Sequence, residues 1–80
     1  MSVVTVYSAP HCQPCNATKR LLDKLDIEHV VIDVSEDPAA RDFALALGYQ
    51  ETPVVFIDTD NHWSGYRPDR IREYAREAQQ

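Results

Sequence analysis

The feature that most constrains this chain is the segment His11-Cys12-Gln13-Pro14-Cys15, which holds the only two cysteines in 80 residues. It lies between a β-branched and aromatic run and a helical pattern, and a Cys-x-x-Cys motif in that place is typical of thiol–disulfide chemistry. A disulfide over this spacing closes a very short loop, so loop entropy gives it only about 2 kcal/mol, near the low end for structural bridges. The sequence therefore favours a cysteine pair kept for its reactivity.

The two cysteines are predicted to differ in role because they differ in position. Cys12 lies at the predicted helix N-terminus, where unpaired N–H groups and the helix dipole favour a thiolate. We predict that Cys12 is the nucleophile and that Cys15, one turn inside, resolves the mixed disulfide. The alternative is half of a metal site, because zinc and iron–sulfur centres usually take four ligands. The only further candidates are three histidines: His11, His29 and His62. His11 is adjacent to Cys12 and badly placed to bind the same metal, and His29 lies in a distant strand. A metal would therefore require a second protomer.

Composition limits the classes of partner. A chain this short is expected to form one small domain over residues 1–80, burying roughly 60–65% of its unfolded surface. The net charge of -5 argues against a nucleic-acid binder, which needs a basic face. No apolar run is long enough to span a membrane, and residues 1–5 lack the features of a signal peptide. We therefore expect a cytoplasmic protein, where a lone Cys-x-x-Cys indicates redox or metal chemistry.

Hydrophobic patterns and turn residues predict four strands and three helices. Strands are expected at residues 3–7, 28–34, 54–57 and 62–64. Helices are expected at about 14–25, 38–47 and 68–78, and each begins at a proline. Asp26 is expected to end the first helix, because Asp tolerates a left-handed conformation, and Gly48 is expected to end the second. Spacings of three and four residues predict three buried helical stripes: Thr18, Leu21, Leu22 and Leu25; Ala40, Phe43, Ala44 and Leu47; and Ile71, Tyr74, Ala75 and Ala78.

The order of these elements predicts the fold class. A strand–helix–strand start gives two parallel strands with a right-handed crossover, and the turn residues 58–61 give an antiparallel hairpin at the end of the sheet. The order β-α-β-α-β-β-α, with Cys-x-x-Cys after the first strand, predicts an α/β protein with a thioredoxin-like fold. Its four-stranded mixed sheet should carry helices on both faces.

Two further segments are candidates for the surface around the cysteines. A proline in the position of Pro53 commonly marks the start of a strand and has no further role. The sharper interpretation is a cis Thr52-Pro53 bond beside the cysteines, with backbone groups of Thr52 turned towards the sulfurs, and the fold context favours it. Trp63 is the only tryptophan, and a single tryptophan more often fills the core than contacts a partner. Its position before Ser64-Gly65-Tyr66 instead predicts a partly exposed apolar surface.

Taken together, the motifs resemble those of the NrdH-redoxins, the glutaredoxin-like electron donors of class Ib ribonucleotide reductase. The resemblance covers nearly the whole chain and rests on residues 12–20, 46–49, 52–55 and 63–69. The last stretch, Trp-Ser-Gly-Tyr-Arg-Pro-Asp, is the most specific, because ordinary glutaredoxins carry there a Gly-Gly plus acidic segment that holds glutathione. Gln13-Pro14 departs from the Val-Gln that is frequent in the family, which leaves the redox potential open.

The resemblance implies a thiol–disulfide oxidoreductase that needs no bound cofactor and works as a monomer. It implies reduction by thioredoxin reductase and delivery of electrons to the large subunit of class Ib ribonucleotide reductase. The alternatives are a glutathione-dependent glutaredoxin and, from another class, an iron–sulfur or metal-binding dimer bridged through Cys12. Against glutathione, Glu51 adds a negative charge, and residues 64–69 add bulk and a proline where backbone N–H groups would be needed. The expected partner-binding residues are His11, Gln13, Pro14, Thr52, Pro53, Trp63, Ser64, Gly65 and Tyr66.

Overall fold

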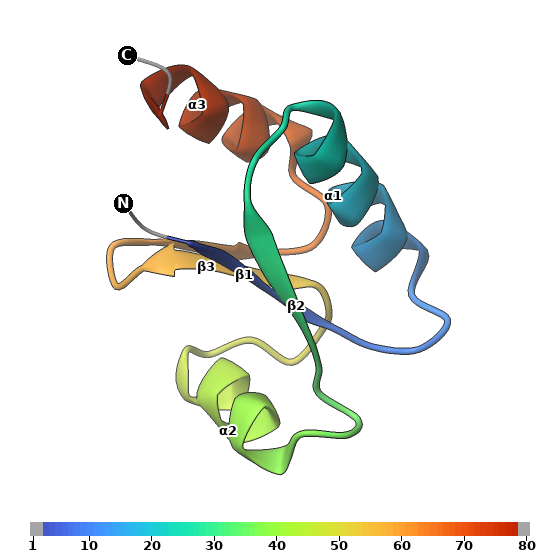
Figure 1. The fold of residues 1–80 in the computed structure, drawn as a ribbon. Helices are drawn as coiled ribbons and strands as arrows, with labels where there is room; N and C mark the ends of the chain where they lie inside the picture. The colour runs from blue at the N-terminus through green and yellow to red at the C-terminus, as the bar shows by residue number, and fades with distance from the viewer. Residues whose placement is uncertain (1–2, 79–80) are drawn as a thin grey trace.

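The computed structural model describes residues 3–78 of the chain. Figure 1 shows a single four-stranded sheet with helices on both sides. The strand order is β2-β1-β3-β4; β1 pairs parallel with β2 and antiparallel with β3, and β4 pairs antiparallel with β3. The expected mixed sheet and thioredoxin-like element order are therefore confirmed. The elements are β1 (Val4–Ser8), α1 (Gln13–Lys24), β2 (His29–Asp33), α2 (Pro38–Ala46), β3 (Val54–Asp58), β4 (Asn61–Ser64) and α3 (Pro68–Ala78).

The sheet separates a larger core from a smaller one. Helices α1 and α3 lie together on one face of the sheet, and α2 lies alone on the other (Figure 1). Because neighbouring residues of a strand point to opposite faces, Val6 and Val55 belong to the α1/α3 core while Tyr7 and Val54 belong to the α2 core. The α1/α3 core is completed by Val4, Leu21, Leu22, Ile57, Trp63 and Ile71, and the α2 core by Ala40 and Ala44.

Two members of the predicted buried stripes are instead exposed. Phe43 on α2 remains 39% exposed, although its ring packs 5.7 Å from that of Tyr7 and 5.2 Å from that of Phe56. The reason is that α2 has no neighbouring helix to cover its flank. Ala78 is exposed because it lies in the last turn of α3, where it lines an open groove with Val3 and Leu25.

Backbone conformations at the helix ends follow the sequence prediction in most places. Asp26, predicted to end α1, has a positive φ of 57°, and Gly48, after α2, has a φ of 98°. His11, directly before the cysteine pair, also has a positive φ of 58°, which the sequence did not indicate. This left-handed residue lies in the loop that leads from β1 into α1.

Strand β2 forms one edge of the sheet and carries exposed apolar side chains. Val30 and Val31 are 49% and 43% exposed, whereas Ile32 packs against the α2 core. The sheet therefore leaves a short apolar strand uncovered at one edge. Within residues 3–78, no helix is long and apolar enough to cross a membrane.

Candidate active site

The two cysteines are joined at the start of α1. Cys12 and Cys15 form a disulfide, with their Cα atoms 5.2 Å apart, so the site is in its oxidised form. Cys12 is the N-cap of α1 and has an extended backbone, and Cys15 lies in the first helical turn. Cys12 is half-buried, whereas Cys15 is 0% exposed. Of the two sulfur-bearing residues, Cys12 is thus the one that a partner can reach.

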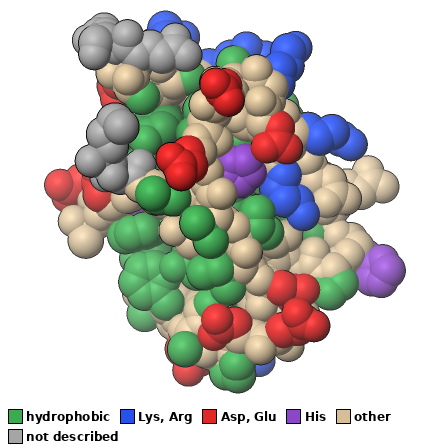
Figure 2. Space-filling view, viewed as in Figure 1, with side chains coloured by type: hydrophobic (Ala, Val, Ile, Leu, Met, Phe, Trp, Pro, Cys, Tyr) green, Lys and Arg blue, Asp and Glu red, His purple; other side chains and the backbone are tan. Residues whose placement is uncertain are grey.

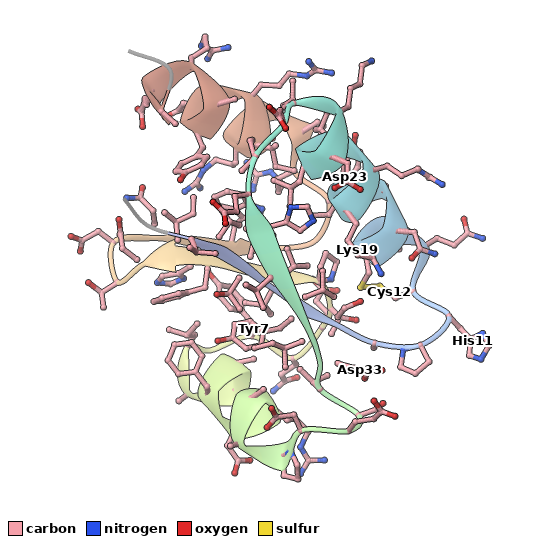
Figure 3. All side chains as sticks on the ribbon, in the orientation of Figure 1. Tyr7, His11, Cys12, Lys19, Asp23 and Asp33 are labelled. Carbon is pink, nitrogen blue, oxygen red and sulfur yellow. A yellow bond between two sulfur atoms is a disulfide. The ribbon has the colours of Figure 1, made fainter. Side chains whose placement is uncertain are left out.

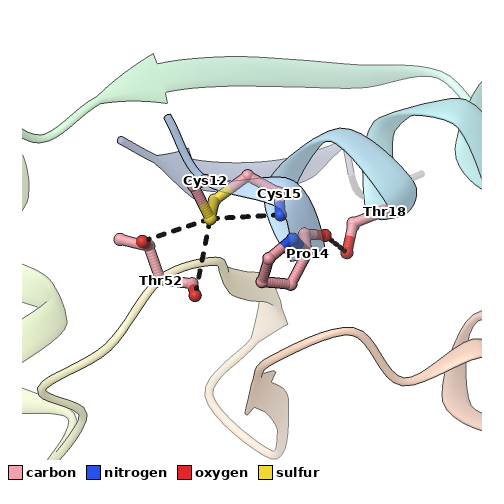
Figure 4. The surroundings of a disulfide bond; sticks show 5 residues. All are labelled: Cys12, Pro14, Cys15, Thr18 and Thr52. Atoms are coloured by element: carbon pink, nitrogen blue, oxygen red, sulfur yellow. Dashed lines mark hydrogen bonds between the residues drawn. A yellow bond between two sulfur atoms is a disulfide. The ribbon is translucent and has the colours of Figure 1, made fainter. Parts of the chain in front are cut away.

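Three polar groups surround Cys12 Sγ (Figure 4). The backbone N–H of Cys15 donates to it at 3.1 Å, and the Thr52 hydroxyl donates at 3.5 Å. The Thr52 carbonyl oxygen lies 3.7 Å away and can accept a hydrogen bond only when Cys12 is a thiol. The two donors favour negative charge on this sulfur, as does the N-terminus of α1. The arrangement therefore stabilises a Cys12 thiolate once the disulfide is reduced.

The second segment predicted for the site lies beside the first. The Thr52-Pro53 peptide bond is cis, as predicted, and Pro53 is fully buried. The backbone N–H of Gly65 donates to the Pro53 carbonyl oxygen at 2.8 Å, and Ser64 pairs with Val54 across the β3–β4 ladder. The structure thus brings Ser64 and Gly65 against the Thr52-Pro53 segment, and Thr52 contacts the disulfide.

Residues 11, 13 and 14 flank the cysteines, whereas the hydrogen bonds to Cys12 Sγ come from Cys15 and Thr52. His11, Gln13 and Pro14 are all exposed, and Figure 3 shows the His11 side chain pointing away from the body of the molecule. The Pro14 carbonyl accepts a 2.8 Å hydrogen bond from the hydroxyl of Thr18, which explains how a polar side chain stays buried within the α1 stripe. Within residues 3–78 there is no cluster of three or more His, Cys, Asp or Glu side chains that could hold a metal.

The prediction that Trp63 is partly exposed is wrong. Its side chain is 5% exposed because alternation along β4 points it into the α1/α3 core, where the Arg70 guanidinium lies 4.9 Å from the ring centroid. The indole Nε1 has no hydrogen-bond partner among the described residues. Tyr66, at 41% exposed, is the aromatic residue that this segment presents to solvent.

One contact near the site was missed by the sequence analysis. The Tyr49 hydroxyl lies 2.8 Å from His62 Nδ1 and donates to the His62 carbonyl oxygen at 3.3 Å. The two rings meet edge to face at 5.6 Å. This contact ties the loop that presents Thr52 to strand β4. Tyr49 follows Gly48 and belongs to no periodic pattern. It lies in the 46–49 segment of the family resemblance, but that segment does not indicate which residue Tyr49 contacts.

Burial shifts the ionisation of one side chain on β1. Tyr7, labelled in Figure 3, has a raised pKa chiefly because of burial, with a smaller contribution from Asp37. Its phenol therefore stays neutral at ordinary pH. The chemistry of the arrangement rests on the two cysteines and on the backbone and hydroxyl groups that surround Cys12 Sγ.

Comparison with known proteins supports this assignment. The glutaredoxin family model matches residues 4–63. Glutaredoxin-like protein NrdH of Salmonella typhimurium is 38% identical over 68 residues, which cover 85% of this chain and 83% of that protein. The Gene 56 protein of Mycobacterium phage L5 is 37% identical over 71 residues, or 88% of this chain and 69% of that one. The solved structure of NrdH-redoxin from Escherichia coli superposes with a TM-score of 0.81 at 37% identity and covers 88% and 91% of the two chains.

Proposed function

Because the chain belongs to the glutaredoxin family, as a glutaredoxin-like thiol–disulfide oxidoreductase of the NrdH type, we propose that it carries electrons from thioredoxin reductase to the large subunit of a class Ib ribonucleotide reductase. The observation that carries the proposal is the likeness to NrdH-redoxin of Escherichia coli, a protein described by its thioredoxin-like activity profile. In this proposal residues 1–80 act as one monomeric domain in the cytoplasm, where a thioredoxin system keeps thiols reduced.

The proposed cycle needs only the two cysteines. The Cys12 thiolate attacks one sulfur of the substrate disulfide, whose S–S bond breaks; a mixed disulfide forms, and the departing thiolate takes up a proton. The Cys15 thiolate then attacks Cys12 Sγ, and the second substrate sulfur leaves as a thiol. The substrate gains two electrons and two protons, and the protein is left with the disulfide seen in Figure 4. Two electrons from thioredoxin reductase restore the dithiol.

Several contacts support thioredoxin reductase over glutathione as the reductant. The N–H of Gly65 is already bonded to the Pro53 carbonyl. Asp69 is bound by Arg67 through Nε and Nη2 at 3.2 and 3.0 Å, and this pair lowers the pKa of Asp69. Exposed Glu51 adds negative charge beside Thr52. A negatively charged tripeptide would thus find few free donors in the segment that replaces the Gly-Gly motif.

We propose that the partner surface is formed by the exposed residues around the disulfide and the segments that support them. Trp63 contributes from within the core by holding β4 in place, since it is buried. The other residues of this surface are His11, Gln13, Pro14, Thr52, Pro53, Ser64, Gly65 and Tyr66.

Coupled assays test the reductant and the acceptor separately. We expect NADPH oxidation in the presence of thioredoxin reductase, this protein and insulin, and little with glutathione and glutathione reductase at matched concentrations. The same NADPH system should support deoxyribonucleotide formation by a class Ib ribonucleotide reductase only when this protein is added. Efficient turnover with glutathione alone would show that the protein is an ordinary glutaredoxin.

A trapping experiment tests the roles of the two cysteines. The Cys15→Ser variant should accumulate a mixed disulfide through Cys12 with the ribonucleotide reductase large subunit, because the resolving thiol is missing. Cys12→Ser should form no such adduct, since Cys15 is buried. Stable adducts through Cys15 would reverse the assignment.

A further inference from the structure

Charged side chains are distributed unevenly over this acidic molecule. Helix α1 and residues 67–78 together carry seven of the eight Lys and Arg residues but only four of the thirteen Asp and Glu residues. Figure 2 shows Lys and Arg side chains along the upper and right edges, over α3 and α1, and mainly Asp and Glu over the lower half, where α2 lies. The α1/α3 side therefore has a net positive charge on a protein whose net charge is -5.

Three of these cations line one open groove between α1 and α3. The groove has a volume of about 240 Å³ and is lined by Ala17, Arg20, Leu21, Lys24, Tyr66 and Arg72; we call it the basic groove. None of its three cations forms an ion pair with the residues that the structure describes. Two of the four carboxylates on these segments have other partners, since Asp69 pairs with Arg67 at 3.0 Å and Asp23 lies 3.7 Å from His29 Nε2.

We propose that the basic groove binds an acidic segment of the protein whose disulfide is reduced at Cys12. Arg20, Lys24 and Arg72 supply unpaired donors for carboxylates. Leu21 and the exposed ring of Tyr66 supply an apolar floor for one side chain of the segment. Tyr66 also belongs to the proposed partner surface, so the groove continues that surface along α1. The inference rests on the proposed function in that the protein donates electrons to protein disulfides.

Helix geometry sets the spacing that such a substrate needs. Arg20 and Lys24 follow Cys12 by eight and twelve residues, which corresponds to about 12 and 18 Å along the helix axis. An extended peptide advances roughly 3.4 Å per residue. The preferred substrate therefore carries Asp or Glu about four or five residues from its reactive cysteine.

Synthetic peptides provide the probe for this preference. Three peptides share one intramolecular disulfide. They differ only at the fourth and fifth residues counted from the cysteines on both sides of the disulfide, and these residues are Glu in one peptide, Gln in the second and Lys in the third. The protein is reduced chemically and freed of reductant, so that each reaction moves two electrons from Cys12 and Cys15 to the peptide without a reductase. At low ionic strength we expect the Glu peptide to react about ten-fold faster than the Gln peptide, and the Lys peptide to be slowest. At 1 M salt, where the Debye length is about 3 Å, the difference should largely disappear.

Charge-reversal variants locate the effect. Arg20→Glu, Lys24→Glu and Arg72→Glu should each slow the Glu peptide roughly two- to five-fold, the range for an exposed ion pair, and leave the Gln peptide unchanged. Arg41→Glu on α2 is the matched control: it makes the same charge change on the opposite face of the sheet and should have no such effect. Reaction with neutral dithiodipyridine corrects each rate for any change in the Cys12 thiolate.

Several outcomes would overturn the inference. Equal rates with the three peptides, or an equal loss in Arg41→Glu, would show that the basic groove does not select substrates. Competition by a DNA oligonucleotide as strong as that by an acidic peptide lacking cysteine would indicate a nucleic-acid site instead. Reduction of the Gln peptide in all variants separates these results from the proposed function, because it shows that the dithiol still donates electrons.

Discussion

Helices α1 and α2 both begin with a capping side chain that proline follows closely, but the two caps differ in chemistry. At α1 the cap is Cys12, whose Sγ accepts the Cys15 N–H at 3.1 Å. At α2 it is Asp37, whose Oδ1 accepts the Ala40 N–H at 3.0 Å. Both caps have extended backbones, with φ of −105° and −128°. The same local geometry thus holds a sulfur at one helix and a carboxylate at the other.

The two caps differ in the equilibrium that the capping interaction favours. A carboxylate is charged at neutral pH in both the folded and unfolded chain, so its interaction with the N-terminus of α2 stabilises the fold. The sulfur of Cys12 carries charge only when the disulfide is open, so at α1 the interaction favours ionisation of the thiol. Capping therefore serves stability at α2 and reactivity at α1.

The largest effect is expected for Cys12→Ser. Disulfide reductase activity should fall by more than about 10³-fold, because no accessible thiol remains. The free energy of unfolding should stay within about 0.5 kcal/mol of that of the reduced wild type, since serine is a strong N-cap. Insulin reduction and urea denaturation measure the two quantities. A larger loss of stability would mean that the sulfur also stabilises the helix, which would weaken the contrast with Asp37.

The next effect concerns the buried faces of the same helices. Leu22→Ala on α1 should lower the free energy of unfolding by about 2–5 kcal/mol, because Leu22 is 1% exposed in the α1/α3 core. Phe43→Ala on α2 should cost less, about 1 kcal/mol, because the ring is 39% exposed. Urea denaturation of both reduced variants tests this order. Equal losses would show that α2 is held as firmly as α1.

Removal of the α2 cap should have a smaller effect. Asp37→Ala should lower the free energy of unfolding by about 1 kcal/mol, because the Ala40 N–H loses its acceptor. Asp37→Ser, which keeps an acceptor, is the control and should lose less. The reaction rate of Cys12 with neutral dithiodipyridine should not change in either variant. A change in that rate would show that the two helix starts are coupled.

The smallest effect is expected in the turn that leads into α2. Hydrogen bonds from the Ser35 hydroxyl and then the Ser35 N–H, at 2.6 and 2.8 Å, hold the pKa of Asp33 below 3.8. The charged Asp33 carboxylate therefore stabilises the folded state at pH values above its ordinary pKa. This stabilisation is lost as the pH falls through the lowered pKa. Ser35→Ala should raise the pKa of Asp33 only part of the way back to its ordinary value, because the N–H at residue 35 still donates to the carboxylate. NMR titration of the Asp33 carboxyl measures the change, and an unchanged pKa would contradict the assignment.

Local signals were enough to predict most of the fold. Asp37-Pro38 marks the start of α2, Asp26 adopts the left-handed conformation that ends α1, and the Cys-x-x-Cys spacing places both sulfurs at one helix end. Each of these features depends on a few neighbouring residues, so the sequence contains the whole signal.

Features that depend on distant contacts were not predicted. Burial of Trp63 depends on which face of β4 is covered by α1 and α3, and exposure of Phe43 depends on the absence of a second helix beside α2. The Tyr49–His62 contact joins a loop to a strand 13 residues away. In each case the deciding partner lies outside the local pattern, which is why sequence periodicity missed it.

The uncovered edge strand β2 has a consequence for self-association. If two copies paired antiparallel through β2 about the Val30–Val31 centre, Glu28 of each copy would face Asp33 of the other, and like charges opposite each other disfavour such pairing. Because Ser35 keeps the pKa of Asp33 low, Asp33 retains its charge in mildly acidic solution. The exposed valines are thus flanked by carboxylates that oppose edge-to-edge aggregation, and this protection should weaken first in strong acid or high salt.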